Sequence, residues 1–212
     1  MAEPEEIAQA VHRIRGRSAQ PARDIALFYM LFATGARPLE IARLELRDYL
    51  NADGSVRRES ELRADATITG KSRPVFFASS KLDDALSTYL RVRAECGHGI
   101  GNPSLFRGLH PDSRLFLTAT GDGFQITPYG EPGQHRFLCR PILETYRKLF
   151  RYADVAGATA LSVRHTVVAR LYDRGADEEQ VGLVLGISDR SAVRELFPRS
   201  RATMASLVEE LV

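Results

Sequence analysis

Cysteine is scarce in this chain of 212 residues, which contains only Cys96 and Cys139. Two cysteines cannot build the disulfide framework of a small secreted domain, and neither belongs to a CxxC or Cys/His cluster of the kind that binds structural zinc. We expect both to be small buried residues in a protein of the reducing cytoplasm. The five histidines show no metal-ligand spacing. The sequence therefore predicts neither a metal nor another cofactor.

Long apolar runs are also missing. The longest, such as IALFYMLFA at 25–33, are far shorter than the roughly 20 residues that a membrane span needs. The N-terminal MAEPEEIAQ is acidic and lacks the apolar core of a secretory signal. We therefore expect no membrane partner and a cytoplasmic location.

Lysine is rare, since only Lys71, Lys81 and Lys148 are lysines among the 29 basic residues. The arginines that make up the rest are suited to phosphate recognition, because the planar guanidinium matches phosphate oxygens. A GC-rich genome produces the same bias. With 27 acidic residues the net charge is only +2, so the chain as a whole is no polycation.

The composition is that of a globular protein, with 44% hydrophobic and 26% charged residues. Apolar spacing predicts a predominantly helical α+β fold with a small antiparallel sheet, formed as a single domain over residues 1–212. Strands are expected at 45–49, 64–69 and 73–78, the last two joined by a hairpin at Gly70-Lys71-Ser72. A long Gly- and Pro-rich loop is expected at 97–136, with a short apolar element at 115–118. Helices are expected at 3–16 (within an extension of about 20 residues), 22–34, 38–44, 80–95, 138–154, 161–174, 177–185, 190–197 and 201–211.

Three separated segments place basic residues at element ends. TGARPLE at 34–40 puts Arg37 between two helices, TGKS at 69–72 puts Lys71 at a hairpin tip, and LSVRHT at 161–166 puts Arg164 near a helix start. Each has an ordinary structural explanation, such as an ion pair or an exposed turn. Their occurrence together and in this order favours a shared role.

Together these segments resemble the catalytic domain of the tyrosine recombinases, the phage-integrase family. Thr34, Gly35, Arg37 and Glu40 match the family's TG-x-R-x-x-E motif, Gly70 and Lys71 match its Gly-Lys hairpin, and Arg164, His165 and Thr166 match its R-H-T. Leu185 and Gly186 match two thirds of its Leu-Gly-His turn. The resemblance covers roughly residues 20–200. It implies that Arg37, Lys71, Arg164 and His165 contact a DNA phosphate.

The same resemblance shows what this chain lacks. In the family, a tyrosine oxygen attacks the phosphate, and arginines stabilise the charge that develops. The two further histidines of the family correspond to Leu161 and Ile187 here, and its nucleophile to Leu196 or Phe197. No tyrosine lies in the last 40 residues. Hydrocarbon side chains can neither donate nor accept protons, so the resemblance implies an inactive relative.

The expected function follows from this loss. The chain would act as a DNA-binding accessory or regulatory factor in recombination or mobile-element control, at the nucleoid of a bacterium, with double-stranded DNA as its partner. The family's N-terminal core-binding domain is absent from the resemblance, so DNA binding by this chain alone should be weak and salt-sensitive. Two alternatives stay open: a protein-interaction module that does not bind DNA, and an active recombinase with an atypical nucleophile.

The C-terminal residues 200–212 predict an amphipathic helix. Met204, Leu207, Val208 and Leu211 follow helical spacing and form one apolar stripe. The stripe either packs on the chain's own core or mediates self-association or binding to a full-length tyrosine recombinase.

Overall fold

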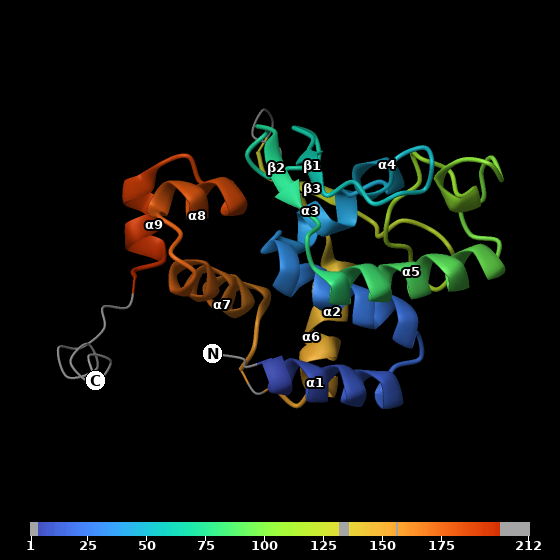
Figure 1. Cartoon of the computed structure of the whole chain (residues 1–212), viewed down its shortest axis with the longest axis horizontal. Helices are drawn as coiled ribbons and strands as arrows, with labels where there is room; N and C mark the ends of the chain where they lie inside the picture. The colour runs from blue at the N-terminus through green and yellow to red at the C-terminus, as the bar shows by residue number, and fades with distance from the viewer. Residues whose placement is uncertain (1–3, 132–135, 156, 200–212) are drawn as a thin grey trace.

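The computed structural model describes residues 4–131, 136–155 and 157–199, so the expected helix at 201–211 lies outside the described residues. It is mostly helical, with two small antiparallel sheets (Figure 1), which confirms the predicted α+β class. No helix of the described part is long and apolar enough to cross a membrane. The elements are α1 (Pro4–Arg17), α2 (Pro21–Thr34), α3 (Pro38–Arg43), α4 (Leu46–Tyr49), β1 (Glu59–Leu62), β2 (Arg73–Phe76), α5 (Ser80–Glu95), a 3₁₀ turn (Phe106–Gly108), β3 (Thr127–Tyr129), β4 (Arg136–Leu138), α6 (Arg140–Tyr152), α7 (Ala160–Asp173), α8 (Glu178–Leu185) and α9 (Arg190–Leu196).

Helix α2 forms the centre of the main body, where it packs against α1, α5 and α7. Its sequence is apolar on most sides, and a helix of that kind is stable only when it is surrounded. It ends at Gly35, whose φ of +59° suits glycine, and the chain then turns into α3. A Cβ at Gly35 would lie 3.2 Å from the Leu185 side chain, so the turn that carries Arg37 lies directly against α8.

The first sheet differs from the sequence prediction. Strand β2 pairs with β1, from Glu59↔Phe76 to Leu62↔Arg73, and residues 64–69 form turns instead of the expected strand. Arg63 explains the difference, since its guanidinium pairs with Glu45, Asp48 and Asp65 while its carbonyl accepts from Ala66 N and Thr67 N. These bonds hold the chain in a turn.

The expected strand at 45–49 is also wrong, because residues 46–49 form helix α4. The Asp48 carboxylate accepts a 2.8 Å hydrogen bond from Glu45 N and so begins the helix. Such side-chain bonding to the backbone competes with strand pairing.

The predicted loop at 97–136 is mostly irregular, apart from the 3₁₀ turn and the sheet of β3 and β4 at its end. Arg93 on α5 organises its first half. This buried guanidinium donates to the carbonyls of His98, Arg114 and Leu115. One side chain thereby satisfies several loop carbonyls that would otherwise be buried without partners.

The described part contains two clusters of buried apolar side chains. The large one fills the main body, from Ile7 on α1 to Val167 on α7. The small one joins the far side of α7 to α8 and α9 and has six buried members. Figure 1 shows α8 and α9 together at one side of the molecule, beyond α7. The small cluster is made of Val168, Tyr172, Val181, Leu185, Val193 and Phe197.

Candidate functional site

A pocket of about 430 Å³ lies where α3, β4, α6, α7 and α9 meet. Two cations, Arg37 and Arg164, lie in its wall, and most of its remaining lining is apolar. We call it the arginine pocket. It brings together side chains from six separated segments: Arg37, Pro38, Leu39, Ile68, Phe137, Leu138, Cys139, Leu143, Ala160, Leu161, Arg164, His165, Ile187, Leu196 and Phe197.

Arg164 is the buried cation of this pocket, with only 4% of its surface exposed. It lies in the first turns of α7, which begins where the Thr159 side chain accepts a hydrogen bond from Ser162 N. Its guanidinium donates to Gly35 O at 2.5 Å and to Leu185 O at 3.2 Å. Arg164 therefore joins the end of α2 to the end of α8, and it keeps further N–H groups for another acceptor.

Arg37 is half-buried, and within the described residues it has no ion pair, as is also true of Arg164. It differs from Arg164 in that its guanidinium donates no hydrogen bond to those residues. Its backbone N–H donates to the buried Glu40 carboxylate at 2.9 Å, which fixes the start of α3. Glu40 itself pairs with Arg73 at 2.8 Å. The nearest carboxylate is therefore engaged by another guanidinium, and the Arg37 side chain is left facing the pocket.

The local charge balance is positive. Burial, with the neighbouring charges of Arg37 and Arg73, lowers the pKa of Arg164 to about 10, and Glu40 opposes this only in part. Three guanidiniums share one carboxylate. Cations held close together in a partly desolvated site repel one another, so the site favours an anion. Asp189 caps α9, where its carboxylate accepts a hydrogen bond from Ser191 N.

The four apolar residues that the sequence resemblance aligns with the family's two further histidines and its nucleophile all line the arginine pocket: Leu161, Ile187, Leu196 and Phe197. Leu161 and Leu196 are 59% and 55% exposed, whereas Phe197 is buried with its ring centroid 4.6 Å from that of His165. His165 is exposed and also lines the pocket. Cys139 carries the one hydroxyl, thiol or carboxylate group among the described residues that line the pocket, and burial raises the pKa of its thiol.

Lys71 does not line the arginine pocket. It is exposed on the ten-residue connection between β1 and β2, and it borders a neighbouring hollow beside α8. The structure thus brings together Arg37, Arg164 and His165 and leaves Lys71 apart. Residues 63–72 form turns instead of a tight hairpin, so the lysine is carried away on a longer connection.

Arg73 was missed by sequence reasoning. It is buried, pairs with Glu40, and donates to Val184 O at 2.7 Å, while its Nε has no hydrogen-bond partner in the described part of the chain. The sequence does contain a pattern that indicates the buried position of Arg73. Arg73 and Val75 occupy the buried positions of β2, and Phe77, directly after the strand, continues the same alternation.

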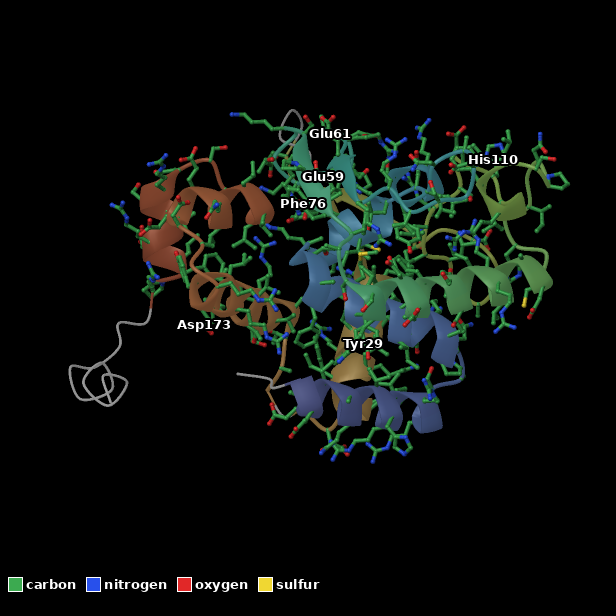
Figure 2. The ribbon with its side chains drawn as sticks, in the orientation of Figure 1. Tyr29, Glu59, Glu61, Phe76, His110 and Asp173 are labelled. Carbon is green, nitrogen blue, oxygen red and sulfur yellow. The ribbon has the colours of Figure 1, made fainter. Side chains whose placement is uncertain are left out.

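Two exposed carboxylates lie on strand β1. Figure 2 shows Glu59 and Glu61 on β1 at the upper edge of the molecule, and both are exposed. Two carboxylates on an outer strand repel phosphate. Within the described residues there is no cluster of three or more His, Cys, Asp or Glu side chains that could hold a metal ion.

Comparison with known proteins gives similarity at the level of the fold. No family model matches the sequence, and no curated protein matches it significantly. Among solved structures, XerA recombinase superposes with a TM-score of 0.65 at 18% identity, over 98% of this chain and 62% of that chain. The pre-cleavage complex of XerH site-specific recombinase with its difH substrate gives 0.62 at 19%, over 98% of this chain and 52% of the other.

The integrase of transposon Tn1549, in complex with transposon right end DNA, gives a TM-score of 0.62 at 17% identity, over 99% of this chain and 64% of the integrase. The chain spans less than two thirds of each of these proteins. The fold is therefore that of a tyrosine-recombinase catalytic domain, and its mostly helical architecture with small antiparallel sheets agrees with that similarity.

Proposed function

We propose that this chain is a catalytically inactive protein of the recombinase fold that grips a DNA phosphate without cleaving it. It would act as an accessory or regulatory factor in recombination or mobile-element control. The observation that carries the proposal is that one pocket holds two arginines without ion pairs in the described residues, together with hydrocarbon side chains at the positions expected for the family's two further histidines and its tyrosine. The DNA-bound state of the XerH and Tn1549 structures adds support from the fold.

The roles of the residues follow from their environments. Arg37 supplies the contact that can adjust its position to the phosphate, because its guanidinium has no ion pair within the described residues. Arg164 supplies a fixed charge, since two backbone carbonyls orient it. His165 is exposed beside them and can donate a further hydrogen bond. Phosphate would be bound by charge-assisted hydrogen bonds, and no group near it would attack the phosphorus.

The test is fluorescence anisotropy of labelled duplex DNA between about 50 and 200 mM salt, the range in which phosphate contacts lose most affinity. Arg37→Gln is the informative variant, because Arg37 donates no side-chain hydrogen bond to the described residues, whereas replacing Arg164 would disturb the fold. We expect about fivefold to tenfold weaker binding at the lowest salt and a salt slope less steep by about one. Arg15→Gln, an exposed arginine on α1, should change neither.

Each other result selects another function. Equal affinity of Arg37→Gln and the parent would place the DNA contact outside the arginine pocket. No binding at the lowest salt, together with dimers in sedimentation, would select the protein-interaction module. A covalent adduct on a nicked DNA substrate would select an active recombinase with an atypical nucleophile.

The partner proposals remain predictions. Self-association or binding to a full-length tyrosine recombinase was expected to use the helix at 200–212, which lies outside the described residues.

A further inference from the structure

The arginine pocket is larger and more apolar than a phosphate contact requires. Its volume of about 430 Å³ falls within the range of small-molecule sites, and sites of that kind combine apolar walls with a few placed polar groups. A phosphate bound to Arg37 and Arg164 would occupy only the cationic part. The rest of the lining would stay in contact with water.

Exposed large hydrophobic side chains are concentrated in the walls of the arginine pocket. Ile68, Phe137, Leu161 and Leu196 are all among the exposed large hydrophobic residues of the described chain, and all four line this one pocket. Single exposed apolar side chains are normal on protein surfaces, whereas a contiguous group around a hollow marks a binding site. These four come from four different segments, so the fold, and not a local run of sequence, gathers them.

The charge and the apolar wall lie in the same cavity. Arg37 has no carboxylate partner among the described residues, and Arg164 keeps unused N–H groups beside it. Charged side chains in an apolar site are costly unless a counter-charge is present. The complementary ligand therefore has an anionic head and an apolar body.

We propose that the arginine pocket binds a small amphipathic anion, a molecule with a carboxylate or phosphate head on an acyl or aryl body. The head contacts Arg37, Arg164 and His165, and the body packs against Leu161, Leu196 and Phe137. The two arginines are those of the proposed phosphate grip, but binding of the small molecule does not depend on DNA.

The experiment uses the whole chain without DNA. The probe is 8-anilinonaphthalene-1-sulfonate, an anion with an aryl body whose fluorescence rises in an apolar site. We expect saturable binding that decanoate displaces, with decanol at least about tenfold weaker because it lacks the charge-assisted hydrogen bonds. Inorganic phosphate should displace the probe only weakly, since it has no apolar body.

Two variants test the contacts with the two parts of the ligand, its anionic head and its apolar body. Arg37→Gln should weaken decanoate about tenfold and leave decanol nearly unchanged. Leu161→Ser should weaken both by about fivefold, because a large part of the apolar wall is lost. Leu105→Ser replaces an exposed leucine that does not line the pocket, and it should match the parent. Circular dichroism confirms that each variant is folded.

Several results would overturn the inference. These are the absence of saturable probe binding, equal displacement by decanoate and decanol, and equal loss in Leu161→Ser and Leu105→Ser. Probe binding that falls as protein concentration rises, with a dimer in sedimentation, would assign the pocket to a second copy. DNA binding is measured separately, so failure of the anisotropy experiment leaves this result standing, and the reverse is also true.

Discussion

The main body and the α8–α9 region hold together by different means. The body buries a continuous cluster around α2, with Leu27, Met30 and Leu31 fully covered. The α8–α9 region has a cluster of six side chains, and its connection to the body includes guanidinium hydrogen bonds from Arg73 and Arg164 to carbonyls at the end of α8. Burial of apolar area stabilises the first region, and directional polar contacts position the second.

This difference matters because the arginine pocket lies between the two regions. Arg37 and Leu39 come from the body, and Ile187, Leu196 and Phe197 come from the α8–α9 region. The shape of the pocket therefore depends on contacts that are individually modest, while the fold as a whole depends on a large core. Three substitutions separate these contributions.

The largest effect is expected in the body. Leu31→Ala removes a fully buried side chain of α2 and should lower the free energy of unfolding by about 4 kcal/mol, as large-to-small core changes do. Urea denaturation measures it. Leu105→Ala, at an exposed position, should change the value by less than about 0.5 kcal/mol. A small loss at Leu31 would mean that α2 is not the centre of the cooperative core.

A smaller loss of stability is expected when the Arg73 contacts that join the body to α8 are removed. Arg73→Met removes the partner of Glu40 and the donor to Val184 O, and it should cost about 3 kcal/mol because a buried carboxylate loses its counter-charge. The measurement is again urea denaturation, with Arg91→Met as control, since the exposed Arg91–Glu95 pair contributes little. Equal stability of both variants would contradict the role of Arg73 in joining the body to α8.

The smallest effect is expected inside the α8–α9 region. Val193→Ala removes two methyl groups from the small cluster, a loss of about 2 kcal/mol that corresponds to roughly 30-fold faster exchange of amides that open locally. Hydrogen exchange should therefore accelerate in α8 and α9 and stay unchanged in α2. Val92→Ala on the exposed side of α5 is the matched control. Acceleration spread evenly over the chain would show that the two regions open together.

Much of the fold could be predicted because strong helical periodicity and end signals agree. The apolar run of α2 with Gly35 after it, and Pro38 at the first position of α3, mark both helices without ambiguity. The strands were harder. β1 has the sequence ESEL, which carries no β-branched residue, so its pairing is decided by β2 and not by its own propensity.

The candidate site could be predicted in part. Arg37, Arg164 and His165 do meet at one pocket, together with the apolar side chains of Leu161, Ile187, Leu196 and Phe197. The position of Lys71 could not be read from the sequence, because the length of the connection depends on which segment pairs with β2. The engagement of Glu40 by Arg73 also depends on tertiary contact, since 33 residues separate the two in the sequence.

Arg164 illustrates a general difficulty in reading motifs. Its guanidinium holds a carbonyl of the body and a carbonyl of α8 at once, so folding alone would select for arginine here, even in a chain that never met a phosphate. An arginine at such a motif position is therefore weak evidence of enzymatic competence when taken by itself. The informative positions are those whose side chains make no structural contact, and Arg37, whose guanidinium has no ion pair within the described residues, is one of them.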